Sequence, residues 1–185
     1  MSKEETKALK QRLSSRIHMT DIRSIIHYVQ GSDERKQELY ALLFDTDEKV
    51  VAYYAGWVMS HFPKKENEWL FDKQDELIDL AMDCRYDGLR RQVLTILYRQ
   101  PMRRSERVDF LDFCMEAMFS SRQPLAVQSL GIKIAYEICR LIPELNQELK
   151  AALDLVDEEE LSPAIRAAKR NVLKAMKTGK SLQNF

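Results

Sequence analysis

The sequence predicts an all-α protein built from a helical hairpin that repeats every 38 residues. Apolar residues recur three or four positions apart along nearly the whole chain, and no stretch shows the two-residue alternation of a strand. Only 5 glycines and 5 prolines occur in 185 residues, and they fall between the periodic stretches. Helical periodicity, sparse helix breakers and an internal repeat together favour stacked helix pairs.

The periodic stretches give the expected helices in chain order. Helices are expected at 3–14, 20–30, 33–44, 47–62, 66–83, 87–100, 105–120, 124–142, 144–155 and 163–177. Capping chemistry supports several of these boundaries, at Ser105, Pro124, Pro143 and Ser162-Pro163 for helix starts and at Pro63 and Pro101 for helix ends. In the last helix, the serine is a good N-cap and the proline suits the first helical position.

Sliding the chain against itself by 38 residues aligns four copies without a gap. Roughly 1–2 all-apolar columns are expected by chance, and five are found. The columns are Leu39, Leu77, Met115 and Leu153; Leu42, Leu80, Met118 and Val156; Val51, Leu89, Val127 and Ile165; Val58, Ile96, Ile134 and Val172; and Met59, Leu97, Ala135 and Leu173. Their spacings of three, seven and eight place them on one face of a helix, so we expect them to form the core.

This repeat resembles the HEAT repeats within the armadillo-type α-solenoids, over residues 33–177. The second helix of such a repeat often carries an Arg after its first core aliphatic, as at Leu89-Arg90 and Ile165-Arg166; the other two copies lack it. The resemblance implies a right-handed α-solenoid (an α–α superhelix) of stacked antiparallel helix pairs. Residues 1–30 are then expected to be a helical cap continuous with the four repeats, and residues 178–185 a flexible tail.

Composition limits the class of protein. The chain is 45% hydrophobic and 31% charged, with 29 basic and 29 acidic residues, which is typical of a soluble globular protein. No apolar run approaches the ~18–20 residues that a membrane span needs, and the first residues lack the apolar core of a signal peptide. Three well-separated cysteines without a CxxC pair are expected to be buried free thiols. We therefore expect a cytoplasmic protein without a membrane partner.

Catalytic motifs are weak. Thr178 to Ser181 read TGKS, like the end of a phosphate-binding loop, but the required preceding glycine is Lys174. The three histidines show no metal-ligand spacing with each other or with cysteine, and no nucleophile motif occurs. We expect no cofactor and no metal, and favour a protein that is not an enzyme.

The core columns fix the rotation of the second helix of each copy, so the positions that face away from the core can be named. The expected partner-binding residues on this face are Tyr53, Trp57, Arg91, Tyr98, Lys133, Tyr136, Arg140 and Lys174. In HEAT-like solenoids these second helices line the concave side, so the resemblance implies a groove with aromatic anchors and cations. The alternative is that the rings pack against the cap or a neighbouring helix and that the cations form a solvated face.

Three kinds of partner remain open. Basic residues gather at 85–107 and 163–180 and acidic residues at 137–160, so a protein or an acidic peptide is the leading expectation. The alternative is a nucleic-acid-binding protein similar to the HEAT-like glycosylases of alkylated DNA, although the outward positions lack the acidic residue that such an enzyme uses. Outward aromatics could also form the seam of a homodimer.

Overall fold

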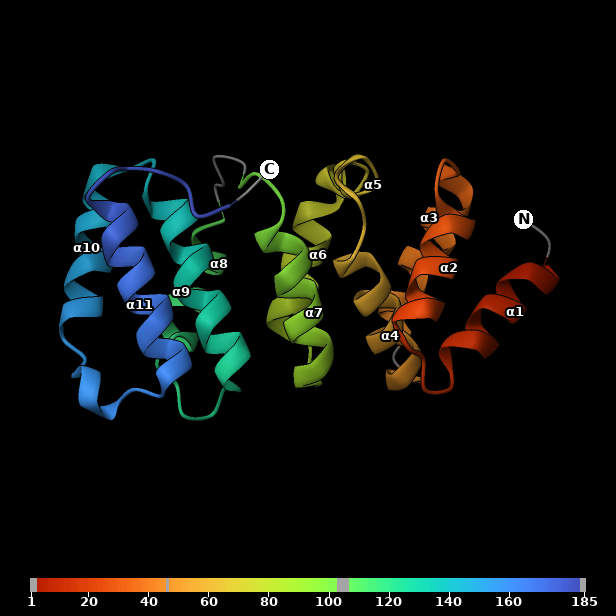
Figure 1. Ribbon diagram of the computed structural model, residues 1–185, viewed down its shortest axis with the longest axis horizontal. Coiled ribbons are helices and arrows are strands. Elements are labelled where there is room, and N and C mark those ends of the chain that lie inside the picture. Colours follow the sequence, from red (N-terminus) through yellow and green to blue (C-terminus); the bar gives the residue numbers. More distant parts are fainter. Residues whose placement is uncertain (1–2, 46, 103–106, 184–185) are drawn as a thin grey trace. The chain divides into compact units, whose positions relative to one another are not determined.

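The computed structural model describes residues 3–45, 47–102 and 107–183, and within these ranges the regular structure is entirely helical (Figure 1). The helices are α1 (Lys3–Leu13), α2 (Met19–Val29), α3 (Asp33–Ala41), α4 (Lys49–Ser60), α5 (Lys64–Glu68), α6 (Gln74–Asp83), α7 (Asp87–Tyr98), α8 (Val108–Ala117), α9 (Leu125–Cys139), α10 (Pro143–Asp154) and α11 (Pro163–Met176). Short 3₁₀ turns are η1 (Leu42–Phe44), η2 (Phe71–Lys73) and η3 (Glu158–Glu160). The predicted all-α class is confirmed.

Several boundaries follow from the capping chemistry. The Ser162 hydroxyl accepts a hydrogen bond from the Ile165 amide at 3.4 Å, and Pro163 opens α11. Pro143 likewise opens α10. The start expected at Ser105 lies outside the described residues, and α8 begins at Val108.

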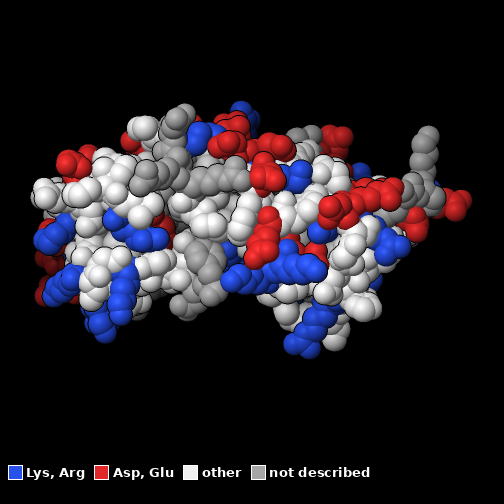
Figure 2. Space-filling view, turned by 90° about the horizontal axis from the view of Figure 1, so that it is seen from above, with Lys and Arg blue, Asp and Glu red and all other residues white. Residues whose placement is uncertain are grey.

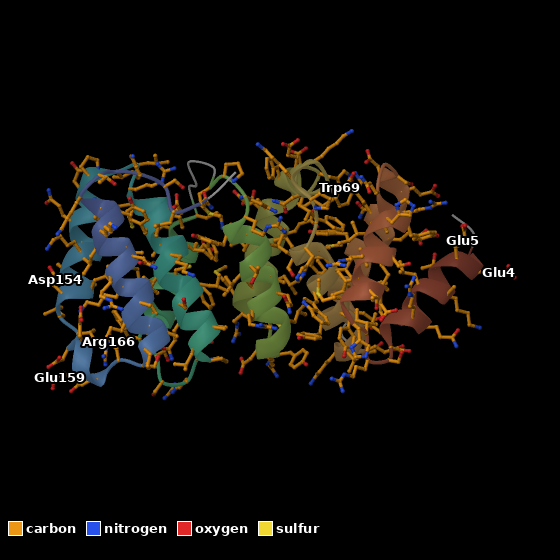
Figure 3. All side chains as sticks on the ribbon, viewed as in Figure 1. Glu4, Glu5, Trp69, Asp154, Glu159 and Arg166 are labelled. Carbon is orange, nitrogen blue, oxygen red and sulfur yellow. The ribbon has the colours of Figure 1, made fainter. Side chains whose placement is uncertain are left out.

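One expected helix, at 66–83, is broken into α5, η2 and α6. The break places the Trp69 ring (labelled in Figure 3) 6.0 Å from the Tyr40 ring, with the ammonium groups of Lys36 and Lys73 at 5.4 and 4.7 Å from its centre. Lys36 is buried and lies 3.0 Å from the buried Glu66 carboxylate. These cation–aromatic and ionic contacts provide partners for a lysine that would be costly to bury alone.

The chain divides into two compact units, residues 1–96 (unit 1) and 97–185 (unit 2). In unit 1, α4 packs against α1, α2, α3 and η1, and α2 also packs against α3. Residues of α1 and α2 contribute to this core, because Leu13, Ile22 and Ile25 are fully buried. The assignment of residues 1–30 as a cap on one continuous domain stays a prediction.

In unit 2, α8 pairs with α9 and α10 pairs with α11, and α9 contacts both α10 and α11 (Figure 1). Gly131 permits the close approach of α8 and α9, because a Cβ there would lie 3.0 Å from the Cys114 carbonyl oxygen. Cys114 and Cys139 are buried free thiols, as expected, whereas Cys84 is only partly buried.

The repeat columns supply most of this core. All but four of the twenty column residues are buried, and the remaining ones are partly buried: Leu80, Met115, Val156 and Leu173. The 38-residue register therefore identified the inward face of both helices in every copy.

The arginine that the resemblance singled out ties the two helices of a hairpin together. Arg90 Nε donates to the Ala81 carbonyl at 3.0 Å, and its Nη2 donates to the Cys84 carbonyl. These carbonyls lie at the C-terminal end of α6, where backbone acceptors lack helical partners and favour a cation. Arg166 (labelled in Figure 3) similarly donates to the Leu161 carbonyl at 3.1 Å, just before α11.

Candidate partner-binding surface

Helix α4 carries two apolar stripes. Its inward stripe includes Val51, Ala55 and Val58, all buried. A second stripe runs through positions 50, 54, 57 and 61, which follow the i, i+4, i+7 and i+11 spacing of one helix face. At 100° per residue the two stripes are roughly 100° apart. A helix that is apolar on both sides is expected to be covered on both, yet Val50 is 48% exposed.

Aromatic rings form a continuous cluster along this second stripe. The Tyr54 ring lies 5.1 Å from Tyr53 and 6.0 Å from Trp57, measured between ring centres. Trp57 in turn lies 6.1 Å from the His61 ring, edge to face. Tyr53 also reaches Tyr86, in the loop before α7, at 6.0 Å. These separations fall in the range in which aromatic pairs attract one another.

Helix α7 supplies the cation of the cluster. Arg91 Nη2 donates to the Tyr53 hydroxyl at 3.3 Å, which places a guanidinium at the edge of the rings. Gly88 makes room for this arrangement, since a Cβ there would lie 3.2 Å from the Tyr53 ring and 3.1 Å from the Tyr86 ring. We call Val50, Tyr53, Tyr54, Trp57, His61, Tyr86 and Arg91 the aromatic surface.

The rings of the aromatic surface are partly exposed to solvent. Tyr53, Tyr54 and Trp57 are all partly buried, and Tyr86 is 37% exposed. The mutual contacts hold the rings in place before any partner arrives. A surface of this kind loses little side-chain entropy on binding, because its rings are already ordered.

Tyr98 and Tyr136, two of the expected binding residues of unit 2, are brought together, but under another part of the chain. Residues 178–183 were expected to form part of a flexible tail. Within unit 2, however, residues 180–183 are held by specific hydrogen bonds to α9 and to Tyr98, the last residue of α7. The Tyr136 hydroxyl donates to the Lys180 carbonyl at 2.7 Å, and the Tyr98 hydroxyl donates to the Leu182 carbonyl at 3.1 Å. Tyr136 is fully buried, so its expected outward position is not observed.

A buried carboxylate organises this contact. Glu137 is 1% exposed and accepts hydrogen bonds from Arg140 Nε at 2.6 Å, the Ser181 hydroxyl at 2.9 Å and the Leu182 amide at 2.6 Å. Burial, with a smaller contribution from the Glu137 charge, raises the pKa of the Tyr98 and Tyr136 hydroxyls. Both tyrosines therefore stay protonated and act as donors.

The other cations expected to bind a partner have varied surroundings. Lys133 lies over the Tyr98 ring at 5.7 Å, and Lys174 is exposed on α11. Lys169, in the same basic helix, is buried and donates to the Val156 carbonyl at 2.7 Å. Figure 2 shows acidic and basic residues interspersed on the face that it presents. The basic segments thus do not act simply as free positive surface.

Sequence reasoning missed Tyr54, Tyr86 and Glu137. Tyr54 could have been found from its four-residue spacing to Val50 and its three-residue spacing to Trp57. Tyr86 lies in a loop, where helical periodicity gives no signal. Glu137 sits one residue after the outward position of Tyr136, and it is the centre of the contact with residues 181 and 182.

Within the described ranges, no group of three or more His, Cys, Asp or Glu side chains could hold a metal ion. In the same part of the chain, none of the helices has both the length and the apolar character to cross a membrane. The arrangement of rings, a guanidinium and backbone-directed hydrogen bonds is suited to binding.

Paired helices in a fixed register, with a shared inward face, define an α-helical repeat protein. The family model described as the HEAT repeat domain matches residues 9–176. The chain belongs to the HEAT repeat family. The match also extends into the segment expected to be a cap. No curated protein and no solved structure matches the chain.

Proposed function

We propose that this protein is a non-catalytic binding module and that a protein partner docks on the aromatic surface of unit 1. The observation that carries the proposal is the ring cluster on and beside the second apolar stripe of α4, where Tyr53, Tyr54 and Trp57 are ordered by one another and remain partly exposed. HEAT repeats commonly serve as scaffolds for protein interactions, and the family membership supports the same class of function.

The chemistry of the surface favours a partner segment with both apolar and acidic side chains. Trp, Tyr and Arg are the residue types that most often dominate binding energy at protein interfaces. The rings offer apolar area with little ordering cost, while Arg91 offers a planar cation for a carboxylate. Val50, exposed at the start of α4, extends the apolar area.

The nucleic-acid alternative lacks a specific supporting observation. Tracking phosphates requires cations that are free to contact them. In unit 2, Arg140 pairs with Glu137, and Lys169 is buried on a backbone carbonyl. Both residues therefore serve the fold. A cytoplasmic location and a homodimeric state remain expectations from the sequence.

The proposal is tested by comparing proteins captured from the native lysate on immobilised chains. The test variant is Trp57→Ala/Arg91→Glu, which removes the central ring and reverses the charge. The control is Leu155→Ala/Arg23→Glu, which makes the same kinds of change at two exposed positions, the leucine being 86% exposed. A matching far-UV circular dichroism spectrum establishes that each variant is folded.

We expect a protein that the wild type and the control capture and the test variant does not. Identical captured proteins from all three chains would overturn the assignment of this surface. Light scattering of the isolated chain separates the homodimer alternative, in which the mass would fall on Trp57→Ala/Arg91→Glu without any partner.

A further inference from the structure

In unit 2, residues 180–183 are held in the way that a binding protein holds a peptide. Tyr136 and Tyr98 donate to the carbonyls of residues 180 and 182, at 2.7 and 3.1 Å, and Glu137 accepts from the backbone amide of residue 182 at 2.6 Å. Three side chains of two helices thus bind three backbone groups of one short segment. Backbone-directed contacts of this kind give affinity for an extended chain largely independent of its side chains.

Further contacts involve the side chains of the bound segment. The Ser181 hydroxyl donates to Glu137 Oε2 at 2.9 Å. The Gln183 side-chain amide donates to the carbonyls of Tyr98 and Gln100 at 2.7 and 2.8 Å. These carbonyls belong to the last residue of α7 and the turn that follows it. These contacts favour a segment in which a residue with a hydroxyl group is followed by any residue with a backbone N–H and then by a glutamine.

The buried Glu137 carboxylate needs hydrogen-bond donors from a bound segment. A buried carboxylate is costly unless it is paired and hydrogen-bonded. Of the three donors to Glu137, Ser181 and Leu182 belong to the bound segment, and only Arg140, the residue that follows α9, does not. An unoccupied site would leave most of that carboxylate's acceptor capacity for water or for another chain.

The segment reaches the site through a turn that favours glycine. Gly179 has φ of +66°, in the left-handed region that ordinary residues adopt at a cost. It follows α11 by three residues and marks where the chain leaves the helix. A Cβ at this position would meet nothing within 4 Å, so the requirement is for the backbone conformation alone.

We propose that Tyr98, Tyr136 and Glu137 form a receptor for an extended polypeptide segment of the type Ser/Thr-x-Gln, and that residues 180–183 occupy it as an internal competitor. A partner protein that carries such a segment displaces residues 180–183 and takes over their hydrogen bonds. This site lies in unit 2 and is separate from the aromatic surface of unit 1, so either assignment can fail without the other.

Because the competitor is tethered next to the site, its effective concentration is on the order of millimolar. A free segment of equal intrinsic affinity therefore binds the wild type more weakly than it binds a chain whose own segment is disabled. The apparent affinity for the free segment is the intrinsic affinity multiplied by the fraction of receptor that is open.

The experiment uses a fluorescein-labelled peptide with the sequence of residues 177–183, Lys-Thr-Gly-Lys-Ser-Leu-Gln, and measures fluorescence anisotropy with full-length chains. The opened chain carries Ser181→Ala/Leu182→Pro, which removes both donors to Glu137 from the internal segment. Two further chains add either Glu137→Gln or, as the matched control, Glu144→Gln at an exposed position on α10. Circular dichroism establishes that all four are folded.

We expect the opened chain to bind the peptide at least about tenfold more tightly than the wild type does. Adding Glu137→Gln to the opened chain should weaken peptide binding at least about tenfold, whereas adding Glu144→Gln should leave it unchanged. A peptide with alanine in place of serine should bind more weakly to the opened chain. The proposal is overturned if the folded opened chain does not bind the peptide, if the wild type binds it equally well, or if Glu137→Gln has no effect.

Discussion

Helix α4 contains a matched pair of valines that tests the repeat register. Val58 belongs to a repeat column and is fully buried, whereas Val50 lies on the second stripe and is 48% exposed. Replacing either with alanine removes the same two carbon atoms and changes intrinsic helix propensity by a similar amount. The difference between the two variants therefore reports burial alone.

The size of the difference follows from the burial. Two carbon atoms withdrawn from a buried site cost about 1.5 kcal/mol in transfer free energy, and an unfilled cavity adds to this. Alanine recovers roughly 0.5 kcal/mol of helix propensity at both sites. We expect Val58→Ala to lower the free energy of unfolding by about 2 kcal/mol and Val50→Ala to change it by less than about 0.5 kcal/mol.

Urea unfolding followed by tryptophan fluorescence is suited to this test, because both tryptophans of the chain, Trp57 and Trp69, lie in unit 1. The signal therefore follows the unit that contains α4, even if the two units unfold separately. Equal midpoint shifts for the two variants, or a larger shift for Val50→Ala, would refute the assignment of the inward face.

Three further results are expected. Tyr136→Phe removes the donor to a backbone carbonyl and should destabilise unit 2 by about 1 kcal/mol in thermal unfolding. Tyr54→Phe should have little effect, because among the described residues the Tyr54 hydroxyl has no hydrogen-bond partner; equal effects would count against the bound segment. Burial raises the pKa of the Cys139 thiol to about 12. Above about pH 8.5 the thiol of the unfolded chain loses its proton while the folded state keeps it. The free energy of unfolding should therefore fall as the pH rises from about 8.5 towards 12. Cys139→Ala should make alkaline unfolding less steep, and an unchanged pH profile would contradict this. In thiol-labelling kinetics of the native protein, partly buried Cys84 should react well before Cys139, and equal rates would refute the burial difference.

The inward faces could be predicted because burial imposes a period on the sequence. Column positions recur at the same point of every copy, so the demand for apolar residues at a 38-residue interval is visible without a structure. Two of the four partly buried column members, Leu173 and Val156, lie in the last copy, where fewer helices follow to cover them; Leu80 and Met115 lie in the second and third copies.

Positions set by contacts distant in the sequence could not be predicted in this way. Tyr136 is 44 residues from its partner at Lys180, and Tyr98 is 84 residues from Leu182. The segment that covers both is polar and has no helical period, so it resembles a free tail in composition. The break between α5 and α6 likewise depends on Trp69 and its contacts with lysines outside α6.

Only some of the outward aromatic positions could be predicted from the sequence. Helical rotation placed Tyr53 and Trp57 away from the core, and both lie on the aromatic surface. The same rotation gave Tyr136 an outward position, yet this residue is fully buried. A rotation angle defines the direction of a side chain, but it carries no information about which segment lies over it.

Site-specific photo-crosslinking in the native cell tests most directly whether a partner protein contacts the aromatic surface. A benzophenone amino acid replaces Tyr54, within the surface, or Arg23, exposed on α2. We expect a discrete crosslinked protein from position 54 that is absent from position 23 and is lost on adding Arg91→Glu. No adduct from position 54, or the same adduct from both positions, would contradict it.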